Sequence, residues 1–96
     1  MVIWTPRARA DLKAIHDYIA HDSPQNAKKI VQGMTNKAET LINLPNLGKV
    51  TSEMQDPLIR EMSAYSWRLI YHKRQDKIFV LTLVHKRRQL GQNEIL

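Results

Sequence analysis

WTPRARADLKAIHDYIAHDSPQNAKKIV, residues 4–31, contains two helix-start signals separated by the length of one short helix. Thr5-Pro6 and Ser23-Pro24 each place a hydroxyl side chain at an N-cap and a proline at the first helical position, where its missing N–H leaves no bond unmade. The first helix should end near His21, so the connection to the second is too short for both to point the same way. This stretch therefore predicts an antiparallel helical hairpin.

Apolar residues recur at helical spacing on both sides of the junction. The first set consists of Ala8, Leu12, Ile15 and Ile19. The second set consists of Ala27, Ile30, Val31, Met34, Ala38, Leu41 and Ile42. Pro45 and Gly48 end the hairpin. Each predicted helix thus has one apolar stripe that another surface must cover.

Short β-type runs lie on either side of the hairpin. VIW (2–4) precedes it, and LIREM (58–62), SWRLIYH (66–72) and KIFVLTLV (77–84) follow it. The last run is apolar on both faces, which is typical of a central strand, and KRQDK (73–77) is a polar turn of hairpin length. The order β-α-α-β-β-β predicts an α+β fold: the helical hairpin packs on one face of a small antiparallel sheet and leaves the other face partly open.

The composition is that of an ordinary globular protein. The 96 residues are 43% hydrophobic and 25% charged, and we expect one domain over residues 1–96. The absence of cysteine from the sequence excludes a disulfide scaffold, a zinc–thiolate site and a thiol nucleophile. The chain begins MVIWTPRARADL, which is charged at once, and no long apolar run follows, so we expect a cytoplasmic protein that does not cross a membrane.

The net charge of +6 is concentrated in the strand region. Eight cations and two acids lie between Arg60 and Arg88, which gives +6 for this segment and zero for the remainder of the chain. Such an excess favours polyanions or acidic proteins as partners. The cations are Arg60, Arg68, Lys73, Arg74, Lys77, Lys86, Arg87 and Arg88.

Arg68 and the run LTLVHKRRQL (81–90) supply the candidate site residues. A strand places Arg68 on one sheet face, where it either pairs with Glu61 across a hairpin or is held rigid and directed at an anion. Alternation would send Arg87 and Arg88, just past the last strand, to opposite faces. His85 is either a surface residue at a strand end or a proton-transfer group.

Other chemistry finds little support in the sequence. His16 and His21 are five residues apart, a spacing that does not bring two metal ligands together on a helix, so we expect no metal site. No GxGxxG, Walker or GxSxG motif is present, and we expect no cofactor. We expect Trp4, Trp67 and Tyr71 to pack in the core and sheet.

Several segments in this order resemble the toxins of the ParE/RelE superfamily of type II toxin–antitoxin modules. They are residues 4–31 quoted above, LPNLGKV (44–50), PLIREM (57–62), WRLIYH (67–72) and LVHKRRQ (83–89). The resemblance implies a helical hairpin on an antiparallel sheet, a role in plasmid stabilisation, and a cognate acidic antitoxin as partner. Acidic residues wrapping a basic strand region would give complementary pairing.

Two activities divide this superfamily. ParE-like members inhibit DNA gyrase, whereas RelE-like members cut messenger RNA on the ribosome. The RelE-like pattern has two lysines in the first strand after the helices, an arginine early in the next, an arginine after the last strand and a tyrosine behind it. This sequence matches the pattern at Arg68 and Arg87, but the lysine positions fall on Ile59 and Glu61, and the tyrosine position falls near Asn93.

These departures favour the ParE-like activity. An apolar side chain and an anion cannot clamp phosphate, and an amide cannot act as a general acid. PLIREM, YSWRLIY (65–71) and VHKRR (84–88) are also more similar to ParE members, and the tail LGQNEIL (90–96) is short for the extra C-terminal helix of many nucleases. We therefore expect a gyrase inhibitor without catalytic residues. Its expected target-binding residues are Arg60, Arg68, His85, Lys86, Arg87 and Arg88.

Two alternatives remain from the sequence. One is a ribosome-dependent mRNA endonuclease that uses Arg68, Arg87 and His85, with Arg60 and His85 compensating for the missing groups. The other is a non-toxic relic that still binds an antitoxin.

Overall fold

The computed structural model describes residues 1–51, 53–54 and 56–88. The chain runs through β1 (Val2–Trp4), α1 (Pro6–Ala20), α2 (Pro24–Thr40), β2 (Lys49–Val50), β3 (Ile59–Ala64), β4 (Trp67–Arg74) and β5 (Lys77–His85). The predicted order is confirmed, with one added strand. The pattern could not reveal β2, because two exposed residues carry no periodicity.

The five strands form one sheet in the order β1-β5-β4-β3-β2. All neighbours are antiparallel except β1 and β5, which run parallel with Val2 opposite Ile78. The sheet is therefore mostly antiparallel, as predicted, with one parallel pair at its edge. That pair is possible because the helices and three strands intervene and return the chain in the same direction.

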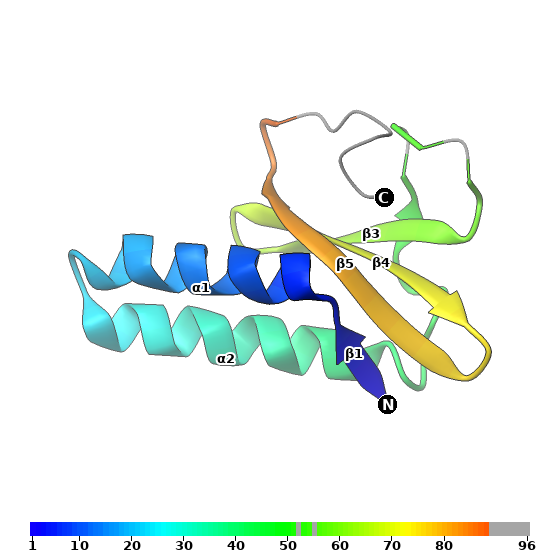
Figure 1. The fold of residues 1–96 in the computed structure, drawn as a ribbon, viewed down its shortest axis with the longest axis horizontal. Coiled ribbons are helices and arrows are strands. Elements are labelled where there is room, and N and C mark those ends of the chain that lie inside the picture. The colour runs from blue at the N-terminus through cyan, green and yellow to red at the C-terminus, as the bar shows by residue number, and fades with distance from the viewer. Residues whose placement is uncertain (52, 55, 89–96) are drawn as a thin grey trace.

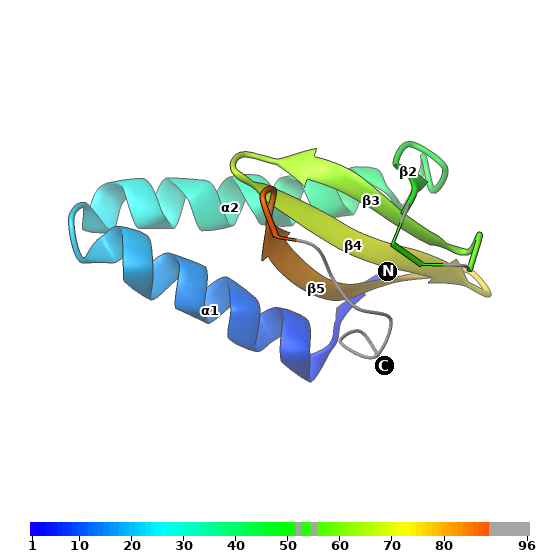
Figure 2. The ribbon, with the colours of Figure 1, turned by 90° about the horizontal axis from the view of Figure 1, so that it is seen from above.

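The two predicted helix starts are confirmed by their N-caps. The Thr5 hydroxyl accepts a hydrogen bond from the Ala8 amide at 3.1 Å, and the Ser23 hydroxyl accepts one from the Asn26 amide at 3.2 Å. Only residues 21–23 separate the helices, so they form the predicted hairpin. Figure 1 shows this hairpin beside the sheet, and Figure 2 shows α1 nearest β5 and α2 nearest β3.

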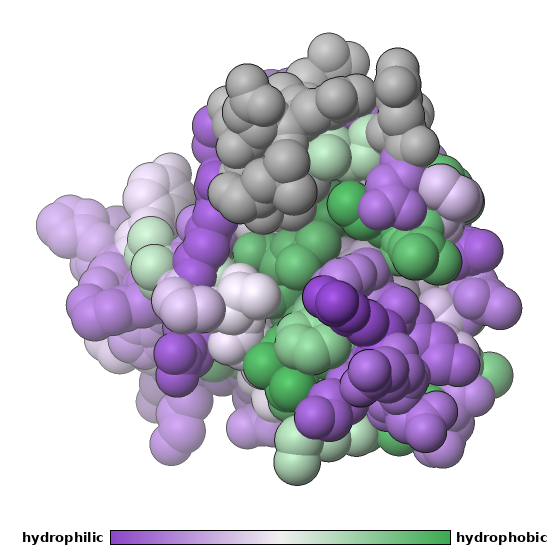
Figure 3. All heavy atoms as spheres, turned by 45° about the vertical axis from the view of Figure 1, so that its right-hand side comes forward, coloured by the Kyte–Doolittle hydropathy of each residue, from purple (hydrophilic) through white to green (hydrophobic). Residues whose placement is uncertain are grey.

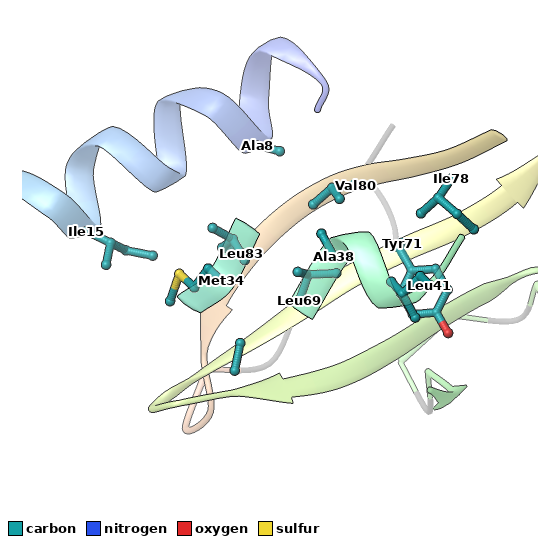
Figure 4. Packing of buried hydrophobic residues seen from close by; sticks show 11 residues of the cluster. Ala8, Ile15, Met34, Ala38, Leu41, Leu69, Tyr71, Ile78, Val80 and Leu83 are labelled. Atoms are coloured by element: carbon teal, nitrogen blue, oxygen red, sulfur yellow. The ribbon is translucent and has the colours of Figure 1, made fainter. Parts of the chain in front are cut away.

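The main core lies between the helical hairpin and one sheet face (Figure 4). Its buried members are Ala8, Ile15, Met34, Ala38, Leu41, Ala64, Leu69, Tyr71, Ile78, Val80 and Leu83. Leu12, Ile19, Trp4 and Trp67 pack against this cluster, as the apolar patterns predicted. Ile42 is an exception at 42% exposure, because α2 ends at Thr40 and the chain then leaves the helical stripe.

The opposite sheet face carries a second, smaller cluster of Met54, Ile59, Ile70 and Val84, with Leu81 against it. One extra residue in β5 separates the partners of Ile70 and Tyr71, which are Thr82 and Val80. This bulge lets Val80 and Leu83, three residues apart, both face the helices.

Two-residue turns join the last three strands. The residues at their centres are Tyr65-Ser66 and Gln75-Asp76, and the first of each pair has a positive φ, 59° and 55° respectively. The predicted polar turn in KRQDK is thus confirmed. Tyr65 packs closely on α2, where a Cβ added at Gly33 would lie 1.8 Å from the tyrosine oxygen. A glycine at this helical position therefore lets the β3–β4 turn approach α2.

Candidate functional site

The cations after β5 lie on a turn. The Lys86 amide donates to the Ser66 carbonyl at 3.0 Å, and the Arg88 amide donates to the His85 carbonyl at 2.9 Å. The strand ends at His85, so strand alternation does not extend to Arg87 and Arg88. The three cations and His85 are exposed on this turn.

His85 is oriented by two contacts. Its Nδ1 accepts a hydrogen bond from the Arg87 amide at 3.2 Å, so the ring proton of the neutral form lies on Nε2. The Trp67 ring meets the imidazole edge-on, with the ring centroids 6.0 Å apart. The side chain is therefore fixed at the surface, with an N–H available to a partner.

Arg68 makes a dense set of hydrogen bonds. Its two terminal nitrogens donate to the Glu53 carboxylate at 2.5 and 2.7 Å, and one of them also donates to Glu61 at 3.1 Å. The other donates to the Arg88 carbonyl at 2.6 Å. Of the two alternatives that the sequence left for Arg68, the structure shows the pairing with Glu61. Glu53 was missed because it lies in a loop without periodicity, fifteen residues away.

The environment of Arg68 is mostly buried. Its side chain is 14% exposed, and those of Glu53 and Glu61 are 9% and 6% exposed. The hydrogen bonds to Glu53, helped by Glu61, raise the pKa of the arginine above its ordinary value despite the cost of burial. The guanidinium is thus charge-compensated and ties together the loop before β3, β3 itself and the segment after β5.

Arg60 lies on the other face of the sheet. It stands opposite Tyr71, whose ring is in the main core, and it donates to the Gly48 carbonyl at 2.7 Å. The Tyr71 hydroxyl accepts from the Gly48 amide and donates to the Pro45 carbonyl, both at 2.9 Å. Burial raises the pKa of Tyr71. Arg60 therefore anchors the loop leading into β2 and does not join Arg68.

The candidate residues fall into separate hollows. A hollow of about 510 Å³ is lined by Leu47, Gly48, Lys49, Glu61, Met62, Ser63, Arg68 and Lys86. A hollow of about 440 Å³ is lined by Tyr65, Ser66, His85, Lys86 and Arg87. Among the described residues, Arg68 thus lines the first of these hollows, His85 and Arg87 line the second, and Lys86 lines both.

The positive charge lies at two ends of the β4–β5 hairpin. Lys73, Arg74 and Lys77 flank the β4–β5 turn, whereas Lys86, Arg87 and Arg88 follow the far end of β5. Residues 78–85 separate Lys77 from Lys86, which is about 30 Å along an extended strand. Figure 3 shows hydrophilic residues over the end of the molecule that carries the β4–β5 turn. The positive charge of the strand region is thus divided between two ends of this hairpin.

The described part of the chain contains neither a cluster of metal ligands nor a membrane-spanning helix. Within residues 1–51, 53–54 and 56–88, no group of three or more His, Asp or Glu side chains could hold a metal ion. Among the same residues, neither helix is long and apolar enough to span a bilayer.

Comparison with known proteins decides the family. Residues 2–90 match the family model described as the ParE toxin of the type II toxin–antitoxin system, parDE. The chain belongs to the ParE toxin family. Among solved structures, it is similar to one described as "Chromosomal ParDE TA system from P. aeruginosa", with a TM-score of 0.72 and 25% identity over 88% of this chain and 92% of that one.

A relative from Caulobacter vibrioides, "Toxin RelE2", is 39% identical over 51 residues. This match covers 53% of the present chain and 58% of the relative, so it spans less than two thirds of that protein. The ParE family assignment rests instead on a match over nearly the whole chain.

In this ParE family member, both lysine positions of the RelE-like nuclease pattern lie within the described residues. Ile59 is 6% exposed within the smaller apolar cluster, and Glu61 is buried against Arg68. Neither side chain can hold a phosphate. The position of the expected tyrosine, near Asn93, and the tail 90–96 lie outside the described residues.

Proposed function

We propose that this ParE family toxin inhibits DNA gyrase in the cytoplasm, serves in plasmid stabilisation and is neutralised by a cognate acidic antitoxin. The observation that carries the proposal is the pairing of Arg68 with Glu53 and Glu61. Metal-free RNA cleavage needs cations directed at phosphate, and this guanidinium is already neutralised by two carboxylates. A phosphate entering here would have to displace them.

The exposed turn after β5 is the proposed target-binding surface. His85, Lys86, Arg87 and Arg88 lie together on it, outside the core. Arg68 supports this surface by holding the Arg88 carbonyl at 2.6 Å, and Arg60 supports the neighbouring β2 loop. We therefore assign positioning roles to these two arginines and direct contact to the other four residues.

The proposed antitoxin follows from charge and from the structural neighbour. The net charge of +6 favours an acidic partner through steering and complementary pairing. The similar structure from P. aeruginosa is described as that of a ParDE toxin–antitoxin system. We propose the same kind of partnership for this chain.

Purified gyrase provides the direct test. Supercoiling should be inhibited by the wild-type protein, and the double variant Lys86→Glu/Arg87→Glu should lose at least about tenfold in potency, because exposed charges at a contact are reversed. Lys73→Glu/Lys77→Glu is the matched control, since it makes the same charge change at the other end of the hairpin. Equal loss in both variants, or no inhibition by the wild type, would contradict the proposal.

A ribosome-dependent nuclease is the second candidate, favoured by the shared hollow of His85, Arg87 and Tyr65. These side chains combine a proton-transfer group with a cation. A translating extract probed for cut messenger RNA tests it. Codon-dependent cleavage with normal supercoiling would replace the gyrase proposal, and no effect in either assay would indicate a relic that binds only an antitoxin.

A further inference from the structure

The sheet face turned away from the helices carries an aromatic pair near the β4–β5 turn. Phe79 stands opposite His72, and the two rings are tilted by 48° with their centroids 5.3 Å apart. The next facing pair, Tyr71 with Val80, points into the main core beneath the helices. Because neighbours along a strand point to opposite faces, Phe79 and His72 lie on the outer face. Both are only half-buried there.

Basic side chains adjoin this aromatic pair on the same face. Arg74 and Lys77 face each other two residues closer to the turn, a step of about 7 Å that their long side chains can cover. Lys73 lies beside them at the rim of the sheet, and all three residues are exposed. Within the part of the chain that the structure describes, no carboxylate forms an ion pair with them, in contrast to Arg68. These cations are therefore available to an external anion.

Two carboxylates and one titratable ring complete the charge balance of this end of the sheet. Asp76 lies in the turn, and the Asp56 carboxylate accepts the Leu58 amide at 2.9 Å. Three cations against these two acids leave a net positive charge. Burial, helped by Arg74 and opposed by Asp56, lowers the pKa of His72 below its ordinary value. The ring is therefore mostly uncharged at neutral pH and presents an aromatic surface.

We propose that the outer sheet face defined by His72, Arg74, Lys77 and Phe79, with Lys73 at its rim, binds single-stranded DNA. One base stacks on the Phe79 ring beside His72, and the phosphates on either side of that base contact the cations. Aromatic rings on an open sheet face stack unpaired bases in this way. The surface lies at the other end of the hairpin from the proposed target-binding turn. The inference therefore goes beyond the proposed function, and it involves no cleavage.

The surroundings of the aromatic pair favour this ligand over its alternatives. A duplex keeps its bases inside the stack, where the rings cannot reach them. Ile3 and Ile59 lie in the same row on either side of the pair and offer no hydrogen bond to a 2′-hydroxyl, the group that distinguishes RNA. An acidic peptide would need a pocket for an anchoring side chain, and this surface belongs to neither hollow of the candidate site.

Fluorescence anisotropy with a labelled oligonucleotide tests the inference. The probe is fluorescein-labelled decathymidylate, titrated with the full chain over a series of salt concentrations. We expect saturable binding, and three phosphate contacts predict a slope of about −2 for the logarithm of the association constant against that of the salt concentration. The duplex with decaadenylate, and decauridylate, should bind at least about fivefold more weakly. Equal or tighter binding of either, or no saturable binding, would overturn the inference.

Substitutions at Phe79 separate stacking from charge attraction. Phe79→Leu keeps an apolar side chain but removes the ring, so it should weaken the probe at least about fivefold. Phe79→Tyr keeps the ring and should stay within about twofold of the wild type. Urea unfolding midpoints will show whether both variants fold. Equal affinity of a folded Phe79→Leu variant and the wild type would contradict stacking and overturn the inference.

Charge reversal on the outer face provides a second test that does not touch the half-buried rings. Arg74→Glu/Lys77→Glu alters exposed residues and should weaken the probe at least about tenfold. Lys28→Glu/Lys29→Glu, at exposed positions of α2, makes the same change in net charge and should stay within about threefold. Similar losses in the two variants would show general attraction to a basic protein and would overturn the inference.

The supercoiling assay keeps this inference apart from the proposed function. Gyrase inhibition by a protein that does not bind decathymidylate sinks only the DNA-binding face. Decathymidylate binding by a protein that does not inhibit gyrase sinks only the proposed target.

Discussion

At the scale of single residues, Arg68 shows how a buried charge acquires a structural role. The sequence allowed it either a cross-strand partner or an external anion. In the folded chain, it contacts two carboxylates and the Arg88 carbonyl while only 14% exposed. Removing one member of such a buried group leaves a charge without its partner. This costs more stability than replacing the whole group by apolar side chains.

Arg68→Met should therefore destabilise the protein by about 3 kcal/mol, because Glu53 and Glu61 lose their common partner. The triple variant Arg68→Met/Glu53→Gln/Glu61→Leu should recover most of that loss. Urea unfolding of the wild type and both variants measures the difference. Equal stability of the single variant and the wild type would show that these ion pairs do not hold the structure.

His72 gives the stability a dependence on pH. Burial, with a contribution from Arg74, lowers the pKa of this half-buried ring below its ordinary value of 6.5. The unfolded chain thus binds a proton more readily than the folded one as the solution becomes acidic. Stability should be fully present above pH 6.5 and should fall as the pH drops through the folded-state pKa.

We expect urea midpoints to decrease between about pH 7.5 and about pH 5.5, and His72→Gln to reduce this decrease. The variant also loses the ring contact with Phe79, at 5.3 Å between centroids, but that loss lowers stability at every pH. His21→Gln, at an exposed helix end, is the control. If both variants keep the slope of the wild type, His72 is not the titrating group.

At the scale of elements, α1 and its N-cap provide hydrogen-bond partners to the part of the β5 edge that lies beyond the end of β1. The register of β1 stops at Val80, whose carbonyl accepts the Thr5 amide at 3.1 Å. The Thr5 hydroxyl donates to the Leu81 carbonyl at 3.0 Å. Six residues further along the chain, the Asp11 carboxylate accepts hydrogen bonds from the Leu83 amide at 3.1 Å and from the Thr82 hydroxyl. Side chains from the helix thus satisfy an open strand edge.

Asp11→Ala should cost about 2 kcal/mol, because it leaves the Leu83 amide and the Thr82 hydroxyl without their acceptor. Asp17→Ala on the same helix is the matched control. Its carboxylate pairs with the exposed side chains of Lys13 and His16, so little change is expected. Chemical denaturation compares the two, and similar losses would argue against the edge role of Asp11.

At the scale of the whole molecule, the surface is uneven in both charge and polarity. The two basic groups lie at opposite ends of the β4–β5 hairpin. The loop after α2 exposes Leu44 and Leu47, each 55% exposed, beside a shallow hollow of about 350 Å³. The neighbouring β2 is an edge strand with an exposed Val50. Exposed apolar groups beside an open edge favour association.

Leu44→Ser/Leu47→Ser should reduce concentration-dependent self-association, while each change alters stability by less than about 0.5 kcal/mol, because both side chains are largely solvated. Sedimentation velocity over a concentration series measures association, and Tyr18→Ser controls for loss of any exposed apolar group. Unchanged sedimentation of the double variant would show that this loop does not mediate contacts between copies.

Local signals in the sequence determined most of the fold. The Thr5-Pro6 and Ser23-Pro24 signals define helix starts through hydrogen bonds within three residues, and the apolar periods identify the face that each helix buries. The strands from Ile59 onward were predictable for the same reason. Such features depend on neighbours along the chain, and they need no knowledge of distant segments.

Only the tertiary structure decided which segments that are far apart in the sequence pair with one another. Three such features are the parallel pairing of β1 with β5, the ion pair of Arg68 with Glu53, and the hydrogen bond from Arg60 to the loop before β2. Each brings together segments that are far apart in the sequence and that no helical or strand periodicity relates. The site was therefore only partly predictable. The sequence located the cations of the site. Which of them stay exposed depends on where the carboxylates lie in the folded chain, because a cation paired with an internal carboxylate is less available to a partner protein.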